Sequence, residues 1–582
     1  MATLGVDVGG TFTDAVLVAA GEVRTAKVAT ASSQDGSVLA AARAVGAFEA
    51  EIERFTHGTT VATNALLERR GARTAFVATA GFEHLLHLRR QTRAHLYRPC
   101  APHPDPLVPL ERCFGVRGRM GPGGELEPVD PESVPRLEEA EAVAVCLLHA
   151  YRDPSHERVV AAELRRRYPA AHVVASHEVA PELREYERAS TTAADAYLGP
   201  VLGAYLRRLG AACAGAGLRE PLVMRSSGGV VTLDEAASHA TWALLSGPAA
   251  GAVGAAVVAR RAGFRHAIAL DMGGTSTDVC AVADGEARRE AERLVGGLPI
   301  RLPTLAIHTV GAGGGSLVRR DAGGALLVGP ESAGALPGPA CYGRGGTLPT
   351  VTDANLLLGR LPETLAGGLE LDVDAAKRAL AGFDPAHVID VVDAELLRAL
   401  RVVSVEQGLD PREHALVAFG GAGPLHACAL AEELEMPAVL VPAAAGVLSA
   451  LGLAASEERR DAVTTYVVPL REAGELPADG VADLRYAGQS FELAVPLGPG
   501  LADRFHAAHE ARYGYADASR EIELVAVRTA LVAPGPRIEL QGPSLSARGP
   551  ELVQLAGATC WVPPGWSGET DRDGTLVLRR TG

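Results

Sequence analysis

The sequence predicts an α/β protein in which one structural unit occurs twice. The first reason is a repeated motif: D-V-G-G-T-F-T-D at residues 7–14 returns as D-M-G-G-T-S-T-D at residues 271–278. Each copy lies between two short apolar runs, which are typical of β-strands. The second reason is a strand, helix and strand pattern at residues 142–176, which is typical of a parallel or mixed sheet. The third is a strand, a glycine run and a helix at residues 415–433.

The repeated motif combines residue types that bind a phosphate and a divalent cation. Adjacent glycines at 9–10 and 273–274 allow the backbone to turn several N–H groups towards one anion. Asp7 and Asp271 end the first strand of each copy, and a carboxylate there can hold a cation such as Mg²⁺. A single copy has an alternative reading as an ordinary hairpin turn. Two copies that share six of eight positions favour a binding function.

Two absences restrict the type of nucleotide site. The chain has no G-x-x-x-x-G-K-[ST] sequence, so a Walker A loop is excluded. It contains only two lysines, Lys27 and Lys377, beside 53 arginines. We therefore expect phosphates to be held from two sides by the duplicated turns.

Composition restricts the class of protein further. A chain of 582 residues is too long for one core and predicts two to four domains. The net charge of −15, with dispersed arginines, argues against a nucleic-acid partner. Eight cysteines without a C-x-x-C pair predict reduced thiols in the cytoplasm and no zinc site. No signal peptide is visible, and the charge-free residues 436–456 contain prolines and glycines, which favours a buried strand, turn and helix over a membrane span.

The first third of the chain gives further elements in order. Strands are predicted at 4–8, 15–18, 22–29 and 74–79, and helices at 36–47, 61–70 and 82–90. Thr59 and Thr60 precede one of these helices, where free N–H groups favour anions, although plain N-capping is the alternative. Residues 99–109 contain five prolines and are predicted as a loop.

The rest of the chain continues this alternation. A long helical stretch at 185–209 is expected to break at Gly199-Pro200. The glycine run at 311–316 either approaches a ligand closely or forms tight turns. Strands at 464–470, 482–497 and 522–532, with a helix at 502–513, predict a small C-terminal α+β module. The expected domains are 1–184, 185–462 and 463–582.

With these segments in place, the sequence resembles the hydantoinase A/5-oxoprolinase family, the ATP-binding subunits within the actin-like ATPase superfamily. The likeness covers nearly the whole chain and departs from the family pattern mainly after Glu551. The motifs that carry it are D-V-G-G-T-F-T-D at 7–14, H-G-T-T-V-A-T-N at 57–64, R-Q-T-R at 90–93, E-Y-E-R-A-S-T-T at 185–192, L-S-G-P-A-A-G at 245–251, D-M-G-G-T-S-T-D at 271–278, H-T-V-G-A-G-G-G-S at 308–316, G-P-E-S-A-G at 329–334, G-P-A-C-Y-G-R-G-G at 338–346, T-D-A-N at 352–355 and G-G-A-G-P-L-H-A at 420–427.

The resemblance implies an actin-like fold of two ribonuclease H-like lobes with ATP between them. It also implies ATP-dependent ring opening of a cyclic amide or imide, such as a hydantoin or 5-oxoproline, or carboxylation of a ketone in related members. A hydantoinase B-like partner subunit and an oligomeric assembly are implied as well. Because the C-terminal departures affect that module, they bear on partner docking more than on ATP binding. A small-molecule kinase and a chaperone-like conformational ATPase are the alternatives, and no membrane association is expected.

We assign the following roles as hypotheses. Asp7 and Asp271 hold Mg²⁺, and one of them orients the acceptor. His57 and Thr59 lie beside the transferred phosphoryl group. The residues expected to bind the nucleotide are Gly9, Gly10, Thr11, Thr13, Gly273, Gly274, Thr275, Thr277, Gly313 and Gly314 around the phosphates, with Gly420, Gly421 and Gly423 near the adenosine.

Overall fold

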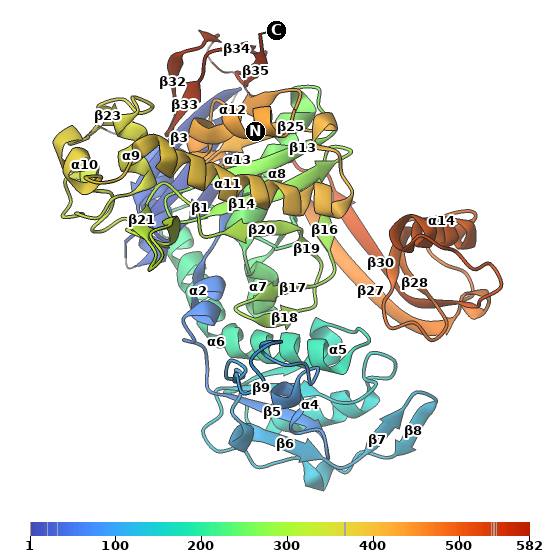
Figure 1. Cartoon of the computed structure of the whole chain (residues 1–582). Helices are drawn as coiled ribbons and strands as arrows, with labels where there is room; N and C mark the ends of the chain where they lie inside the picture. The colour runs from blue at the N-terminus through green and yellow to red at the C-terminus, as the bar shows by residue number, and fades with distance from the viewer. Residues whose placement is uncertain are drawn as a thin grey trace.

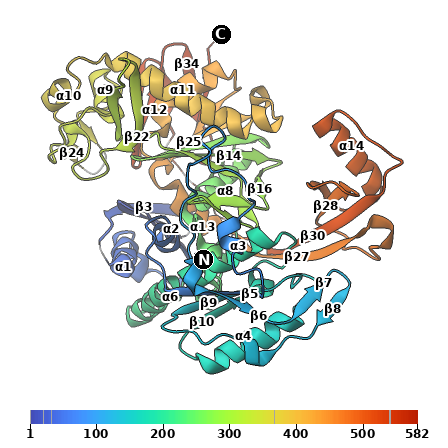
Figure 2. The ribbon, with the colours of Figure 1, turned by 60° about the horizontal axis from the view of Figure 1, so that its bottom comes forward.

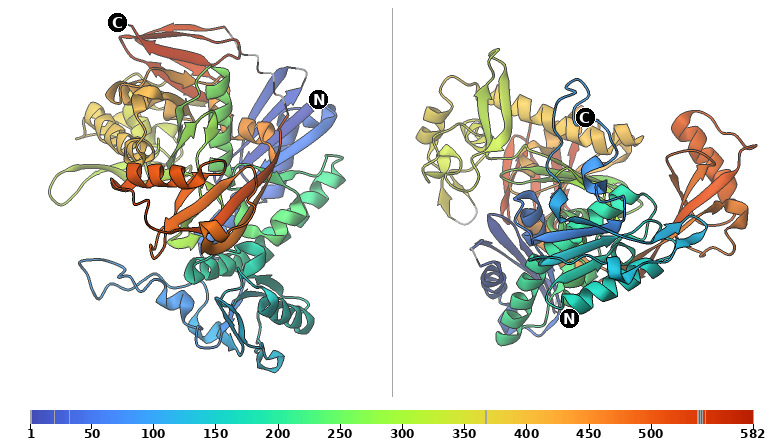
Figure 3. Two further views of the ribbon diagram at one scale, coloured as in Figure 1. Left: turned by 90° about the vertical axis from the view of Figure 1, so that its right-hand side faces the viewer. Right: turned by 90° about the horizontal axis from the view of Figure 1, so that it is seen from below.

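The structure is a computed structural model that describes residues 2–19, 21–31, 33–365, 368–536, 538, 540, 542 and 544–581. Two large sheets form the upper part of the molecule in Figure 1. A third, smaller sheet lies below them. A C-terminal unit, residues 458–533, stands to the right of the sheets in Figures 1 and 2 and in the right panel of Figure 3, and it faces the viewer in the left panel of Figure 3. No helix within the described ranges combines the length and apolarity that crossing a membrane requires.

The first large sheet carries the first motif at the end of its central strand. Its strands are β1 (Ala2–Val8), β2 (Phe12–Ala19), β3 (Glu22–Ala29), β4 (Ile52–Gly58) and β11 (Leu222–Met224). They lie in the order β3-β2-β1-β4-β11, with β1 antiparallel to β2 and parallel to β4. Helices α1 (Gln34–Ala44) and α6 (Glu185–Gly215) share its hydrophobic core.

The second large sheet repeats this arrangement. Its strands are β13 (Ala267–Met272), β14 (Thr277–Ala283), β20 (Ile307–Val310), β25 (Ala415–Phe419) and β26 (Val439–Val441). Their order is β20-β14-β13-β25-β26, and β13 is again antiparallel to the second strand and parallel to the fourth. The shared order is that of a ribonuclease H-like unit. The predicted duplicated, actin-like α/β fold is therefore confirmed.

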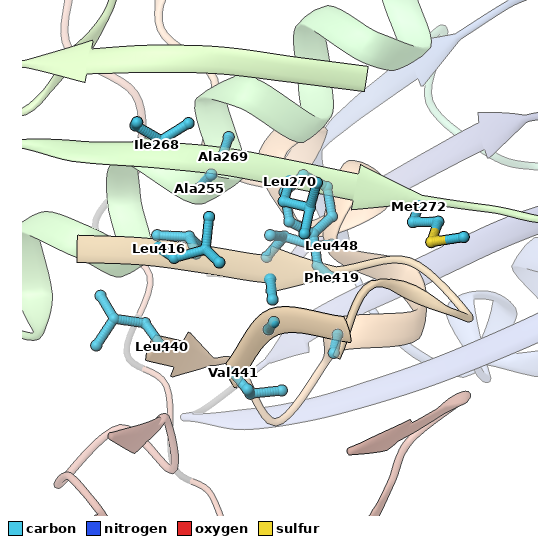
Figure 4. Close-up of a cluster of buried hydrophobic side chains, with 14 of the residues drawn as sticks. Ala255, Ile268, Ala269, Leu270, Met272, Leu416, Phe419, Leu440, Val441 and Leu448 are labelled. Atoms are coloured by element: carbon cyan, nitrogen blue, oxygen red, sulfur yellow. The ribbon is translucent and has the colours of Figure 1, made fainter. Parts of the chain in front are cut away.

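The two sheets meet through a pair of closely packed helices, α8 (Ser246–Arg261) and α13 (Leu448–Ala455). A Cβ on Gly452 would lie 1.9 Å from the carbonyl oxygen of Ala250, so only glycine allows this approach. A Cβ on Gly5 of β1 would likewise lie 2.1 Å from the Ala450 carbonyl oxygen of α13. Figure 4 shows apolar side chains of β13, β25 and β26 together with residues of these helices in one buried cluster.

A separate sheet of parallel strands interrupts the first lobe. Its order is β10-β9-β5-β6, formed by β5 (Thr74–Thr79), β6 (Cys113–Val116), β9 (Ala142–Cys146) and β10 (His172–Ala175), and α4 (Ser155–Arg167) connects β9 to β10. This confirms the strand, helix and strand unit predicted at 142–176. Residues 99–109 contain neither helix nor strand, as their prolines predict.

The C-terminal stretch contributes to both large sheets. Strands β27 (Glu458–Pro469), β28 (Val481–Tyr486), β29 (Leu493–Pro496) and β30 (Ile522–Ala533) extend the first sheet and pack on α14 (Leu501–Tyr513). Strands β31 (Ser546–Arg548), β34 (Trp566–Thr570) and β35 (Leu576–Arg580) extend the second. A hairpin of β32 (Glu551–Leu555) and β33 (Ala558–Val562) lies between them in sequence.

Three expected elements differ in the structure. Helix α6 runs without a break through Gly199 and Pro200, because it is buried between sheets that support it on several sides. The strand expected at 482–497 is two strands, β28 and β29, because residues 487–492 turn the chain, with Gly488 at φ +84°. The helix expected at 82–90 is reduced to α3 (Leu85–Leu88).

Candidate functional site

The two motif copies form the same hairpin. In the first, Asp7 pairs with Asp14, and the Gly9 N–H donates to the Phe12 carbonyl at 2.9 Å. In the second, Asp271 pairs with Asp278. There the N–H of Gly273 donates to the carbonyl of Ser276 at 3.1 Å, which is the equivalent bond. Residues at the turn tips, Gly10, Gly274 and Thr275, are exposed, and Thr11 is half-buried.

The glycine run at 311–316 packs directly on the second turn. The N–H groups of Gly314 and Gly315 donate to the carbonyls of Gly273 and Gly274 at 3.0 and 2.7 Å. A Cβ on Gly313 would lie 2.7 Å from the backbone nitrogen of Thr275, so a side chain has no room there. The glycine run at 311–316 therefore forms tight turns and also makes a close approach, as the two sequence alternatives proposed. What it approaches in this structure is the second motif turn.

The glycine run at 420–423 also reaches the second motif. A Cβ on Gly420 would lie 2.5 Å from Asp271 Oδ1, and the Ala422 N–H donates to the Met272 carbonyl at 2.9 Å. Gly421 is exposed, while Gly423 begins α12 (Gly423–Glu433). Three glycine runs that are far apart in sequence thus meet around Asp271, and they bring the N-terminus of a helix with them.

Asp7 lies in the matching position of the first lobe. A Cβ on Gly58 would lie 2.4 Å from its Oδ1, and one on Gly247, in the first turn of α8, would lie 3.3 Å from its Oδ2. Oδ1 of Asp7 is buried and has no hydrogen-bond partner within the described residues. A buried carboxylate oxygen without a partner is costly, so this atom is a strong candidate for binding a ligand.

Burial and neighbouring negative charges disfavour the ionised forms of Asp7 and Asp271. Burial, followed by the charge of Asp14, raises the pKa of Asp7 from 3.8 to about 7. Burial, followed by the charges of Asp278 and Asp7, raises the pKa of Asp271 from 3.8 to about 8. Each of these shifts means that the ionised carboxylate is disfavoured where it stands. The charge of Asp7 contributes to the raised pKa of Asp271, so the two side chains lie within electrostatic reach of each other across the lobes.

The donor set fits magnesium. Mg²⁺ prefers oxygen ligands and is usually held by one or two carboxylates together with water and substrate phosphates, without a complete cage of protein ligands. Asp7 and Asp271 provide such carboxylates. In the parts of the chain that the structure describes, no group of three or more His, Cys, Asp or Glu side chains forms a cage for a metal.

His57 does not lie beside the motif turns, contrary to the sequence expectation. It pairs with Val6 on β1, and because strand side chains alternate, it points to the opposite face from Asp7. Its ring is fully buried, with Nδ1 3.1 Å from the Val6 carbonyl and Nε2 2.8 Å from the Tyr205 hydroxyl. The carbonyl accepts only, so Nδ1 donates and Tyr205 donates to Nε2. Burial lowers the pKa of His57 to about 4, which keeps the ring neutral.

Thr13 and Thr277 also face away from the tips of the turns and brace them from behind. The Thr30 hydroxyl donates to the Gly9 carbonyl at 3.0 Å, so Thr13, 3.0 Å from that hydroxyl, donates to it. Thr277 donates to the Ala312 carbonyl at 2.6 Å and thereby fixes the glycine run at 311–316. These hydroxyls support the turns and are not available to a phosphate in this structure.

Thr59 is buried at the junction of the first lobe with α8. Its hydroxyl accepts from the Val61 N–H at 3.2 Å, whereas Thr60, the N-cap residue of α2 (Val61–Leu67), makes no side-chain capping bond. Ser246, which belongs to the L-S-G-P-A-A-G motif at 245–251, holds Thr59 from both sides through its hydroxyl. It accepts from the Thr59 N–H at 3.0 Å and donates to the Thr59 carbonyl at 2.9 Å. The L-S-G-P motif was the only sequence signal for this contact.

Comparison with known proteins decides the family. Residues 188–462 match Hydantoinase/oxoprolinase, and residues 3–168 match the Hydantoinase/oxoprolinase N-terminal region. The caprolactamase subunit alpha of Pseudomonas jessenii is 34% identical over 640 residues, which cover 97% of this chain and 90% of that protein. The chain belongs to the hydantoinase/oxoprolinase family. The family resemblance noted in the sequence is thereby confirmed.

Other relatives are named for different activities. The acetophenone carboxylase gamma subunit of Aromatoleum aromaticum is 34% identical over 498 residues, 77% of this chain and 67% of that protein. The 5-oxoprolinase 1 of Arabidopsis thaliana is 36% identical over 471 residues, 72% of this chain and 37% of that longer protein. The crystal structure of ATP-dependent caprolactamase from Pseudomonas jessenii matches with a TM-score of 0.87 at 31% identity over 100% of both chains. The hydantoinase/oxoprolinase fold is therefore shared over the full chain.

Proposed function

We propose that this protein binds magnesium-ATP between its two lobes and uses it to open a cyclic amide or imide. The observation that carries the proposal is the pair of equivalent turns on opposite lobes, each preceded by a half-buried aspartate with a raised pKa. The likeness to an ATP-dependent caprolactamase over the full chain supports the same function.

The residues divide into three roles under this proposal. Asp7 and Asp271 hold Mg²⁺, which neutralises phosphate charge. The turn residues offer backbone N–H groups and hydroxyls to phosphate oxygens; they are Gly9, Gly10, Thr11, Gly273, Gly274 and Thr275. Gly313, Gly314, Gly420, Gly421 and Gly423 shape the second half of the site, and Gly423 brings the N-terminus of α12, where free N–H groups favour anions. Thr59 supports the first half through Ser246 and does not touch the phosphates.

The chemistry that ATP would supply is activation of an unreactive carbonyl. An amide resists hydrolysis, and transfer of the terminal phosphoryl group to its oxygen makes the carbon electrophilic. The overall reaction converts ATP, the cyclic amide and two water molecules into ADP, phosphate and the open-chain amino acid. Phosphoryl transfer depends chiefly on positioning and charge neutralisation. The arrangement of glycine turns and carboxylates is suited to both.

We further propose that the protein works with a second, hydantoinase B-like subunit. The support is that caprolactamase and acetophenone carboxylase relatives are themselves named as subunits. In that case this chain contributes the nucleotide and the partner contributes to substrate binding. Size-exclusion chromatography of the co-expressed pair tests the assembly, and separate elution of the two proteins contradicts it.

The test of function is turnover with defined compounds. The protein, with and without the candidate partner, is incubated with magnesium-ATP and a series of lactams, hydantoins and 5-oxoproline. Ring-opened acid formed together with ADP supports the proposal. Asp271→Ala is expected to abolish ATP turnover while its circular dichroism stays unchanged, and near-normal hydrolysis by this variant refutes the assignment of Asp271.

Carboxylation of a ketone is the second candidate, because a ketone carboxylase subunit is 34% identical to this chain. The same assay separates the two functions when bicarbonate and an aromatic ketone replace the cyclic amide. A carboxylated product supports carboxylation. A stable phosphorylated compound indicates a kinase instead, and ADP release stimulated only by protein indicates a conformational ATPase.

A further inference from the structure

The two halves of the site differ in charge at one equivalent strand position. In the first lobe, Asp14 of β2 pairs with Lys27 of β3. In the second lobe, the equivalent Asp278 of β14 pairs with Thr309 of β20. Lys27 Nζ donates to Asp14 Oδ1 at 2.6 Å, and Thr309 Oγ1 donates to Asp278 Oδ1 at 2.5 Å. The duplication therefore repeats the aspartate and a donor to it. The donor is a cation in the first copy and a hydroxyl in the second, where Arg293 Nη2 lies 3.4 Å from Thr309 Oγ1.

The register puts Lys27 on the face that looks towards the second lobe. Asp7, Asp14 and Lys27 lie directly opposite one another on β1, β2 and β3, so their side chains share one face of the sheet. Gly5, two residues before Asp7, packs against α13 on that same face. Two strand spacings, about 10 Å in all, separate the backbones of Asp7 and Lys27. The flexible four-carbon stem of lysine bridges part of this distance.

The turn of the β32–β33 hairpin lies beside the stem of this lysine. A Cβ on Gly557, in the turn of the β32–β33 hairpin, would lie 3.8 Å from Lys27 Cε. The same turn touches the second lobe, because the Gly446 N–H donates to the Ala556 carbonyl at 3.2 Å. The neighbouring Ala445 carbonyl accepts from the Gly420 N–H at 2.9 Å. Lys27 thus lies between the first turn and the glycine run that approaches Asp271.

The ammonium group remains accessible and acts on both metal-binding aspartates. The Lys27 side chain is 33% exposed, so a ligand entering the site can reach it. Its Nζ also lies 5.4 Å from the centre of the Phe12 ring, at the edge of the first turn. The charge of Lys27 lowers the pKa of Asp7 and of Asp271, against the larger effect of burial. A positive charge that both aspartates experience is close to the space between them.

We propose that Lys27 is a nucleotide-binding residue whose ammonium group contacts phosphate oxygens, with Asp14 holding it in place in the free protein. This inference rests on the proposed binding of ATP. Lysine binds phosphate as a compact point charge. In this chain it performs, from a strand of the first lobe, the part that the missing Walker A lysine plays in other nucleotide sites.

The first test uses the fact that the chain has only two lysines. An acyl-phosphate derivative of ATP transfers its acyl group to an amine close to the phosphates, forming an amide bond and releasing ATP. Mass spectrometry of the labelled full-length protein should find the label on Lys27, and excess magnesium-ATP should suppress it at least tenfold. Lys377, on the remote helix α10 (Val373–Ala379), is the internal control and should label weakly and without protection. Equal labelling of both lysines, or no protection of Lys27, overturns the inference.

The second test separates phosphate binding from support of Asp14. Lys27→Met is expected to weaken the binding of magnesium-ATP at least tenfold in titration calorimetry, whereas Lys377→Met leaves it unchanged. Lys27→Met alone leaves the carboxylate of Asp14 without its ion-pair partner. In the double variant Lys27→Met with Asp14→Asn, residue 14 is uncharged and needs no such partner. If Lys27 only supports Asp14, this double variant regains wild-type affinity, which overturns the inference. If Lys27 binds phosphate, the affinity stays at least tenfold weaker than in Asp14→Asn alone.

The wild-type protein distinguishes failure of this inference from failure of the proposed function. Binding of magnesium-ATP by the wild type with an unchanged affinity in Lys27→Met leaves the ATP site intact and refutes the role of Lys27 alone. No binding by the wild type refutes the ATP site and the role of Lys27 together.

Discussion

Replacing Asp271 by asparagine tests whether the site is built for a cation. Asparagine keeps the shape of the side chain and removes its charge. In the metal-free protein, burial and the charges of Asp278 and Asp7 raise the pKa of Asp271 from 3.8 to about 8. A carboxyl group with a raised pKa binds its proton more tightly in the folded state than in the unfolded state. Stability is therefore lost as the pH rises from 3.8 towards about 8.

The magnitude follows from this shift. The full change in pKa corresponds to an upper limit of about 6 kcal/mol in the free energy of unfolding. Relaxation and water penetration around a buried charge reduce such penalties, and we expect Asp271→Asn to be about 1–3 kcal/mol more stable than the wild type at about pH 8 in EDTA. At about pH 5 the difference should be much smaller, because the wild-type carboxyl is then largely protonated in the folded protein.

The assay is urea unfolding at both pH values, with EDTA or with excess magnesium. Magnesium should stabilise the wild type at about pH 8 and leave Asp271→Asn unchanged. Asp284→Asn is the matched control, since Asp284 is 70% exposed, and its effect should stay within about 0.5 kcal/mol. If Asp271→Asn is no more stable than the wild type in EDTA at about pH 8, the electrostatic reasoning is wrong.

Three further predictions concern the support of the site. Gly452→Ala should lower the free energy of unfolding by about 1–3 kcal/mol or more, because its Cβ would lie 1.9 Å from the Ala250 carbonyl oxygen. Gly215→Ala, whose Cβ would enter open space, is the control and should change the free energy of unfolding by less than about 1 kcal/mol. Equal effects of the two substitutions in urea unfolding would contradict the helix packing. Tyr205→Phe should lower the free energy of unfolding by about 1–3 kcal/mol, because it leaves His57 Nε2 without a hydrogen-bond donor. The affinity for magnesium-ATP, measured by calorimetry, should stay unchanged. A large loss of affinity would indicate that His57 belongs to the nucleotide site. Burial lowers the pKa of His57 from 6.5 to about 4, so the free energy of unfolding should fall by up to about 3 kcal/mol as the pH decreases from 6.5 to about 4. His57→Gln should remove this part of the pH dependence, which urea unfolding at several pH values measures. An identical pH dependence in the wild type and in His57→Gln would contradict the prediction.

The sequence predicted features that depend on neighbouring residues. The two hairpins follow from apolar runs on either side of a double glycine, and both form as expected. The charge-free residues 436–456 likewise form the strand β26 and the helix α13. The duplicated motif also led to the correct fold class, because two similar local structures in one chain indicate two similar lobes.

Side-chain direction was harder to predict, because it depends on which face of a strand is covered. His57, Thr13 and Thr277 lie next to motif residues in the sequence, and we expected them to lie beside the phosphates. Strand alternation instead turns all three away, and their polar atoms are used by Tyr205, Thr30 and the Ala312 carbonyl. If a strand continues up to the glycine turn, neighbouring residues point to opposite faces of the sheet. The spacing in the sequence therefore already placed these three side chains on the face opposite to the aspartates.

Contacts between distant segments had almost no sequence signal. The strands β31, β34 and β35 join the second sheet, although the first part of the C-terminal stretch belongs to the first sheet. The β32–β33 hairpin, where the sequence departs from the family pattern, lies beside the Lys27 stem. Its turn also accepts a hydrogen bond from the Gly446 N–H. Such pairings depend on the complete fold, and no local pattern specifies them.

Titration calorimetry with magnesium-ATP tests the central claim most directly. The account predicts that one nucleotide binds per wild-type chain, that EDTA weakens the binding strongly, and that Asp271→Asn binds at least tenfold more weakly. Absence of binding by the folded wild-type protein, or equal affinity in Asp271→Asn, would contradict a nucleotide site built from the two opposed turns.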